Sequence, residues 1–148
     1  MANLTGQIII PQQWGATSGT TGGGTTPLNG TPKSSRTGVT ALAAQTSIDL
    51  DSDQISSGTT GRLVGILLGG NVRLQATLHT VVDGVASSVR MDFYHPFGAT
   101  RYYAIPDARL FQAPESAAVG FDGFRMTVTN CEGISSGDIL VTFIWEEV

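Results

Sequence analysis

The chain contains few of the residues on which enzyme and metal chemistry most often depend. Its 148 residues include one cysteine, Cys131, and two histidines, His79 and His95, which lie 16 positions apart. A single cysteine excludes an internal disulfide, and we expect it to pack as a small buried hydrophobe. No H-x-H or H-E-x-x-H pattern joins the histidines, so a zinc or cupin-type metal site is not expected.

Lysine occurs only once, at Lys33, and the formal net charge is −4. Proteins that bind nucleic acid usually carry a basic stripe, which this chain lacks. No hydrophobic run reaches the length of a membrane span. Residues 1–10 also lack the basic and apolar regions of a signal peptide. We therefore expect no nucleic-acid partner, no membrane partner, and synthesis in a reducing cytoplasm.

Motifs for catalysis are missing as well. The Gly19–Gly24 run lacks the GK[ST] ending of a phosphate loop, and no G-x-S-x-G nucleophile motif occurs. A glycosidase needs two carboxylates in one cleft. Spacing along the sequence does not show which two of the candidate carboxylates would lie together, and these candidates are Asp92, Asp107, Glu115 and Asp122. We expect that the protein is not an enzyme and uses no cofactor.

Three acids alternate at Asp49, Asp51 and Asp53, which places them on one face of an extended segment. Such a cluster could attract Ca²⁺, yet an EF-hand would need glycine at Gln54 and glutamate at Thr60. We expect a solvated acidic face and no metal site.

What the chain does contain is glycine, at 19 positions, together with short runs of alternating apolar and polar residues. Long helical periodicity is absent, so the pattern favours an all-β domain with many turns. Outside the centre of the chain, alternation is clear at Ser47–Asp53 and Phe124–Asn130, and Asp138–Val148 is expected to be a last strand that is largely apolar on both faces. We predict an antiparallel β-sandwich of jelly-roll type over residues 39–148.

The centre of the chain, Arg62–His95, predicts a three-stranded antiparallel meander. Gly69-Gly70 and Asp83-Gly84 are two-residue turn signals. Counting outward from the second turn pairs Val82 with Val85 and, further along, Leu74 with Phe93. Counting from the first turn pairs Leu67 with Val72.

The first strand of this meander is apolar on both faces. Leu63 and Leu67 line one face, and Val64, Ile66 and Leu68 line the other. A strand of this kind must be covered on both sides. Either it is a fully buried sandwich strand, or Val64, Ile66 and Leu68 form the interface of an oligomer.

Residues 1–38 differ from the rest. Gly, Ser and Thr make up 17 of the 28 residues from 11 to 38, a composition too polar to form a core. We predict an extended N-terminal arm that docks on a partner protein through four residues: Trp14, Leu28, Lys33 and Arg36. The alternative for Trp14 is that it packs back on its own domain.

An aromatic group follows the meander. Tyr94, Arg101, Tyr102 and Tyr103 combine the residue types that are enriched in contact surfaces. The group is either a surface patch for a carbohydrate or a protein, or in part a piece of the core.

Together these features resemble the small virion proteins of tailed bacteriophages, in particular head decoration (cement) proteins. The resemblance rests on the start at Met1-Ala2-Asn3-Leu4, the Gly/Thr-rich Gly15–Gly38, the acidic and nearly lysine-free β-domain, and the apolar Val64, Ile66 and Leu68. It implies a homotrimer that binds the major capsid protein on the outer surface of the virion. The protein would be made in the host cytoplasm. The alternative is a receptor- or glycan-binding module of a phage fibre or tail.

Overall fold

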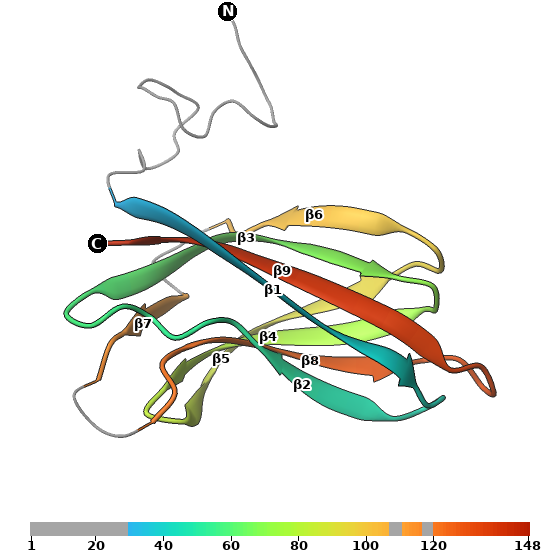
Figure 1. Ribbon diagram of the computed structural model, residues 1–148. Coiled ribbons are helices and arrows are strands. Elements are labelled where there is room, and N and C mark those ends of the chain that lie inside the picture. The colour runs from blue at the N-terminus through green and yellow to red at the C-terminus, as the bar shows by residue number, and fades with distance from the viewer. Residues whose placement is uncertain (1–29, 107–110, 117–119) are drawn as a thin grey trace, which may run out of the picture. The chain divides into compact units, whose positions relative to one another are not determined.

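The computed structural model describes residues 30–106, 111–116 and 120–148 (Figure 1). The described part contains nine strands in two antiparallel sheets. One sheet holds β1 (Thr31–Leu42), β9 (Gly137–Glu147), β3 (Thr60–Gly70) and β6 (Thr100–Ala104), in that order, with β7 (Gln112–Pro114) also paired to β3. The other holds β2 (Ser47–Asp51), β8 (Gly123–Asn130), β4 (Leu74–Val82) and β5 (Val85–His95), again in that order.

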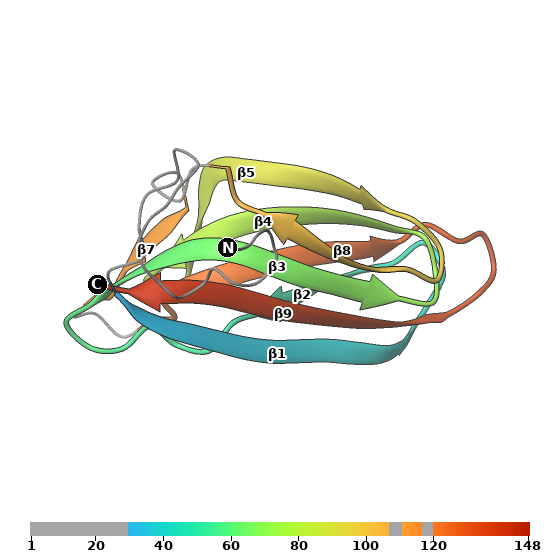
Figure 2. The same cartoon turned by 90° about the horizontal axis from the view of Figure 1, so that it is seen from above.

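The two sheets pack face to face, and their strand order is that of a jelly roll. Because β6 and β7 both pair with β3, they act as one interrupted strand. The chain then behaves as a long hairpin folded over itself. β1 pairs with β9, β2 with β8, β3 with β6 and β7, and β4 with β5. Figure 2 looks onto the first sheet and shows the second behind it. The predicted β-sandwich is confirmed.

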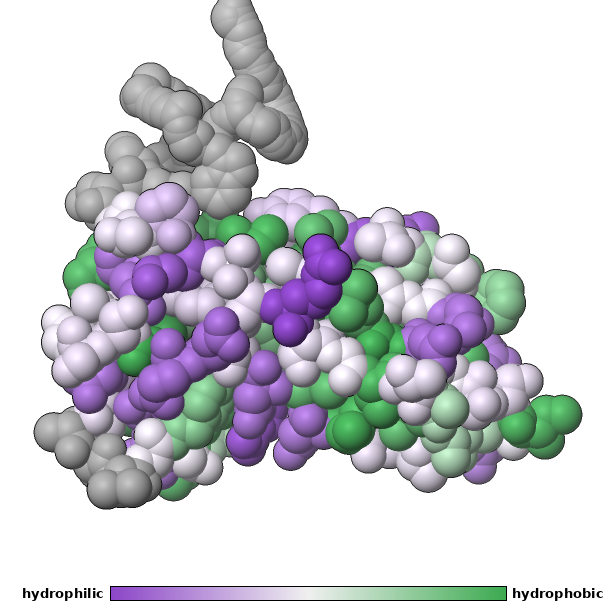
Figure 3. All heavy atoms as spheres, viewed as in Figure 1, coloured by the Kyte–Doolittle hydropathy of each residue, from purple (hydrophilic) through white to green (hydrophobic). Residues whose placement is uncertain are grey.

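The core lies between the sheets and is built from alternating inward side chains. Phe124, Met126 and Val128 of β8 are fully buried, as the sequence predicts, and they face Val141 and Phe143 of β9. Val39, Leu42 and Ile48 close the core where β1 ends and β2 begins. Apolar spheres gather there in the right half of Figure 3. Within the described ranges, no helix is long and apolar enough to span a membrane.

The predicted meander is wrong in its first half. β3 and β4 do not form a hairpin; they lie in different sheets, and the chain crosses from one to the other at Asn71–Arg73. Gly69 and Gly70 belong to β3, where they pair with Leu140 and Ile139 of β9. The two glycines signal a break in the chain but do not say whether the next strand stays in the same sheet.

The second hairpin, β4 to β5, exists with a shifted register. Val82 faces Val85 across the Asp83-Gly84 turn, as predicted, but Leu74 faces His95 and not Phe93. An irregularity between His79 and Val81 moves the partner along β5 by two residues. A shift of two residues keeps every side chain on its own face, so the predicted buried face of β4 still holds.

The predicted boundary of the arm is also wrong. Residues 31–38 form most of β1 and pair with β9, with Thr31 opposite Glu147. Lys33 and Arg36 therefore belong to the sheet. Trp14 and Leu28 lie outside the described residues. No alternation of apolar and polar residues marks Ser34–Gly38 as a strand in the sequence. The reason is that β1 is an edge strand whose inward positions include Lys33 and the small polar residues Ser35 and Thr37.

The predicted oligomer interface fails for two of its three residues. Ile66 and Leu68 are 0% exposed inside the core of one chain, and Val64 is half-buried. A bulge between Leu63 and Gly65 explains the double-sided apolar pattern. It brings Leu63 onto the same inward face as Ile66 and Leu68. The alternative of a buried sandwich strand holds for these two residues.

Candidate functional site

The outer faces of the two sheets differ sharply in charge. On the β2–β8–β4–β5 sheet, three rows of four outward residues carry five charged side chains. We refer to this surface as the charged face, and its rows are Ser47, Thr129, Gln75 and Tyr94; Asp49, Thr127, Thr77 and Asp92; Asp51, Arg125, His79 and Arg90.

The carboxylates of the charged face accept hydrogen bonds from other residues of the same face. The Arg125 guanidinium donates two hydrogen bonds to Asp51, at 2.7 and 2.9 Å. Thr127 donates to Asp49 at 2.6 Å, and Thr77 donates to Asp92 at 2.7 Å. The hydrogen bonds that Arg125 donates to Asp51 raise the pKa of Arg125, which keeps the guanidinium charged. In the described part of the chain, no three His, Cys, Asp or Glu side chains could together hold a metal ion.

The middle of the outer face of the β1–β9–β3–β6 sheet carries little charge, while Asp138 lies at one end of this face and the Arg62–Glu146 ion pair at the other. The matching three rows of four outward residues hold one charged side chain, that of Arg36. We refer to these three rows as the charge-poor face, and they are Ala104, Gly65, Ile144 and Ser34; Tyr102, Leu67, Thr142 and Arg36; Thr100, Gly69, Leu140 and Gly38.

At two positions of this face, neighbouring atoms lie so close to the backbone that only glycine fits. The Tyr102 ring lies directly over Gly65, where any side chain would collide with it. A Cβ on Gly38 would come within 2.5 Å of the Ile139 carbonyl oxygen. An open trough of about 680 Å³ runs between β1 and β3, lined in part by Gly38, Gly69 and Leu140.

The predicted aromatic patch is only partly on the surface. Tyr94 is 78% exposed and Tyr102 is 49% exposed, while Arg101 is also exposed. Tyr103 turns inward and packs on Phe93, with ring centroids 4.7 Å apart. Phe97 of the β5–β6 turn belongs to the same aromatic group of the sequence and is 68% exposed. We call Tyr94, Phe97 and Arg101 the aromatic corner.

His95 is buried beneath this corner and has a structural role. Its Nε2 lies 2.7 Å from the Ala99 carbonyl oxygen, and its Nδ1 lies 2.9 Å from the Tyr103 hydroxyl. Because a carbonyl oxygen only accepts hydrogen bonds, Nε2 must carry the proton. In the neutral ring, Nδ1 then accepts from the Tyr103 O–H. This pair ties the β5–β6 turn to the core.

Replacing Tyr103 with phenylalanine should destabilise the protein by about 1–3 kcal/mol, because it leaves the buried Nδ1 of His95 without a donor. Thermal or urea unfolding measures the loss. Tyr94→Phe removes the same hydroxyl at an exposed site and serves as the matched control, with an expected change within about 0.5 kcal/mol. Equal effects of the two substitutions would contradict the assigned hydrogen bond.

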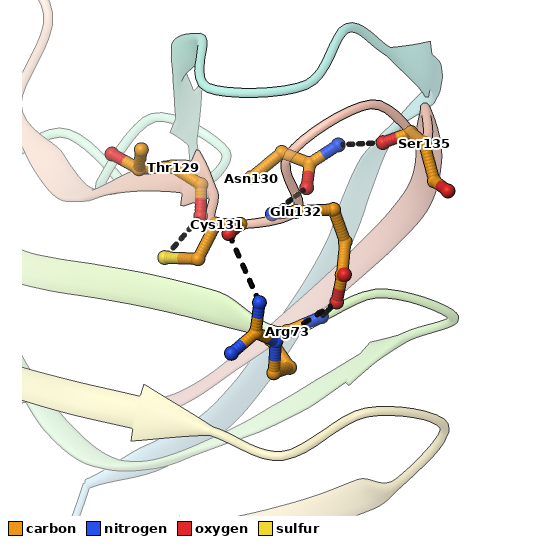
Figure 4. Close-up of polar contacts among 6 residues, drawn as sticks. All are labelled: Arg73, Thr129, Asn130, Cys131, Glu132 and Ser135. Carbon is orange, nitrogen blue, oxygen red and sulfur yellow. Dashed lines mark hydrogen bonds and ion pairs between the residues drawn. The ribbon is translucent and has the colours of Figure 1, made fainter.

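Cys131 is partly exposed, directly after β8, so the expectation of a buried hydrophobe is wrong. Its neighbour Glu132 accepts hydrogen bonds from the backbone N–H and the Nε of Arg73, at 3.0 and 3.1 Å (Figure 4). Asn130 donates to the Ser135 carbonyl oxygen and to that of Leu42. These contacts fix the β8–β9 connection, and they leave Cys131 beside Arg73 at the surface.

Asp122, a candidate acid in the sequence, is fully buried and joins three segments. Its carboxylate accepts hydrogen bonds from the backbone N–H groups of Asp83 and Ser116, at 2.7 and 2.9 Å, and from Gln54 Nε2 at 3.1 Å. Burial by itself raises the pKa of Asp122, but these hydrogen bonds outweigh it and leave the pKa below its ordinary value. The geometry is that of a structural carboxylate.

Lys33 also has a partner within its own domain. Its Nζ lies 3.6 Å from the buried carboxylate of Glu147. Glu147 accepts further hydrogen bonds from the Ser56 backbone N–H and from Trp145 Nε1. Burial raises the pKa of Glu147, and these contacts together lower it below its ordinary value. The contacts of Lys33 therefore anchor β1 to the end of β9.

Sequence reasoning missed the charge-poor face. Its rows run across four strands, so they appear only when the pairing of β1, β9, β3 and β6 is known. A local signal was present, since Leu140 and Thr142 alternate with buried residues of β9. No protein-family model matches the chain, and no curated protein matches it either.

Proposed function

We propose that the protein is a structural virion protein that binds the outer surface of a phage capsid and stabilises it, acting as a homotrimer. The observation that carries this proposal concerns the side chains whose chemistry could serve catalysis. His95, Asp122 and Glu147 are all held in buried structural contacts, whereas the exposed surfaces are broad sheet faces. A protein of this kind acts through the surface area that it buries against its partner.

The fold supports the proposal by analogy. Jelly rolls recur among viral capsid domains and lectins, although a fold alone does not define a function. Two of the four edge strands have features that discourage pairing with another sheet: β5 is irregular opposite Val81 of β4, and β6 is only five residues long.

Direct binding tests the proposal. Capsids of the phage that would encode this protein are assembled from a genome that lacks its gene. They are then mixed with the purified chain and sedimented. We expect the chain to co-sediment to saturation and to raise the temperature at which the capsids open. Absence of co-sedimentation at micromolar concentration would refute the capsid role.

Removal of residues 1–30 should abolish capsid binding and leave the domain folded, because β1 starts at Thr31. Co-sedimentation and thermal unfolding measure the two effects separately. Removal of residues 1–38 is the informative comparison, since it also deletes most of β1 and its pairing with β9. That variant should lose stability as well as binding. Full capsid binding by the shorter deletion would show that the arm is not the attachment.

A second function is favoured by the aromatic corner. Exposed Tyr94 and Phe97 beside Arg101 could stack on sugar rings and hydrogen-bond to their hydroxyls. In that case the protein would be a receptor- or glycan-binding module of a phage fibre or tail. A glycan array separates the two functions, because binding that is lost in Tyr94→Ala would favour the glycan module.

A further inference from the structure

We infer that a groove between Arg73 and Arg101 binds an acidic saccharide, whose carboxylate pairs with the two guanidinium groups while a sugar ring packs on Tyr94. The inference rests on the second function proposed above, the glycan-binding module. It adds the class of the ligand and the residues that recognise its charge, and it does not depend on the capsid role.

The groove lies at one corner of the sandwich, where four segments of the chain meet. β4 begins beside the ends of β5 and β8, so the residues just beyond these strand ends gather there: Arg73, Pro96 and Cys131. The β5–β6 turn brings Arg101 of β6 to the same place. Together with Tyr94, these residues line an open groove of about 440 Å³. Small-molecule sites have volumes of about 300–1,000 Å³, so the groove has room for a saccharide unit.

Arg73 is held in place and still has donors to offer. Its backbone N–H and its Nε donate to Glu132, and its Nη2 donates to the Cys131 carbonyl oxygen at 3.3 Å (Figure 4). A guanidinium carries five N–H donors, so three of them have no partner in the described part of the chain. The contacts to Glu132 and Cys131 fix the guanidinium at the groove, where the remaining donors can bind a carboxylate.

Arg101 supplies the net positive charge of this corner. Its side chain is exposed and forms no ion pair within the described ranges. The charge of Arg73 is offset by Glu132, because the hydrogen bonds from Arg73 lower the pKa of Glu132 and keep it ionised. Asp92, two residues before Tyr94, pairs with Arg90 and does not line the groove. Two arginines and one glutamate therefore leave one positive charge here, in a chain whose net charge is −4.

The chemistry of a guanidinium selects the charged group of the ligand. Arginine binds carboxylates through paired, charge-assisted hydrogen bonds, which are about twice as strong as bonds between neutral groups. An anion is repelled by most of this acidic protein but attracted to the corner that holds Arg101. A neutral sugar would leave Arg101 without a partner, so the groove favours a saccharide that carries a carboxylate.

The apolar part of the groove fits a sugar ring and not a bare anion. The Tyr94 ring is 78% exposed, and the half-buried Pro96 lies beside it in the groove. Phe97, at 68% exposure, continues the aromatic surface into the β5–β6 turn. A sugar ring can lay its C–H groups on such a flat apolar surface and keep its hydroxyls in water. An inorganic anion would contact only the guanidinium groups and leave this surface uncovered.

Isothermal titration of the full chain with matched pairs of oligosaccharides tests the inference. The acidic probes are short oligomers of galacturonic acid, of mannuronic acid and of sialic acid. Each is compared with its carboxyl-reduced form, in which every carboxylate is replaced by a neutral hydroxymethyl group. We expect at least one acidic probe to bind, and its reduced form to bind at least about tenfold more weakly. Absence of binding by all acidic probes at about 1 mM would overturn the inference.

Arg101→Gln removes the charge of the groove, and we expect it to weaken binding of the acidic probe at least about tenfold. Arg90→Gln is the matched control, since it removes the same charge from the charged face, where the Arg90 side chain is 62% exposed. Its affinity should equal that of the parent chain. Tyr94→Ala should also lose binding, because it removes the ring surface. Thermal unfolding confirms that each variant is folded.

Three results would overturn the inference even if a sugar binds. They are equal loss of affinity in Arg101→Gln and Arg90→Gln, equal affinity of acidic and reduced probes, and binding of inorganic phosphate as tight as that of the acidic probe. A neutral sugar that binds the parent and Arg101→Gln alike but not Tyr94→Ala would keep the glycan module and exclude the acidic ligand. Capsid co-sedimentation of the parent chain needs no sugar, so failure of the capsid role is measured separately.

Discussion

Replacing Asp122 with alanine should cost at least about 3 kcal/mol of unfolding free energy, which is a large share of the stability of a typical domain. The substitution strands three hydrogen-bond donors at one end of the sandwich: the backbone N–H groups of Asp83 and Ser116, and Gln54 Nε2. Each stranded buried donor costs about 1–3 kcal/mol. Urea unfolding of the parent and the variant measures the difference.

Asp122→Asn removes the negative charge of the side chain and keeps its shape. The amide keeps one acceptor oxygen but turns the other into a donor that faces donors, so an intermediate loss is expected. Because the pKa of Asp122 is lowered in the folded state, its carboxylate adds stability above its ordinary value of 3.8. That stability is lost as the pH falls through the lower folded pKa. The difference between parent and Asp122→Asn should therefore shrink in acid. A constant difference from pH 7 to pH 2 would contradict the role of the charge.

Replacing Leu74 with alanine should cost about 2–5 kcal/mol, as expected for a leucine that is 1% exposed in a packed core. Leu74 belongs to the inward face of β4 together with Ala76 and Leu78, and all three are buried. The removed side chain leaves a cavity between the sheets that the rigid strands cannot close. Thermal or urea unfolding gives the loss directly.

Leu67→Ala is the matched control for this cavity. Leu67 lies on the outward face of β3 and is 37% exposed, so the same truncation should cost about 1 kcal/mol or less. If Leu74→Ala were as mild as Leu67→Ala, the assignment of the two faces would be wrong.

The sequence predicts the faces of the strands well and their neighbours poorly. Alternation in Phe124–Asn130 identifies the buried side of β8 because the period of two is a local property of the strand. Partner choice depends on distant segments, so nothing local in Gly69-Gly70 distinguishes a hairpin from a crossing between sheets. The register of β4 with β5 failed for a related reason, since the irregularity near Val81 leaves no clear mark in composition.

The candidate site shows the same limit. Residue type placed all three tyrosines in one possible surface patch and left open which of them belong to the core; Tyr94 and Tyr102 are exposed, while Tyr103 is partly buried and hydrogen-bonded to His95. Lys33 was assigned to an arm because its neighbours are small and polar. Only the pairing with β9 shows that these neighbours form an edge strand and that the Lys33 side chain reaches Glu147.

The pairing of Thr31 with Glu147 has a practical consequence for engineering. The chain enters and leaves the sandwich at the same end, and Thr60 and Val148 exchange backbone hydrogen bonds there (Figure 1). Ends so close together favour circular permutation, in which a short linker joins them and new ends are opened elsewhere. The β8–β9 connection, where Ile134 is 96% exposed, offers such an opening at the opposite end of β9. A peptide displayed at that tip would stand a full strand length away from Thr31 and Glu147.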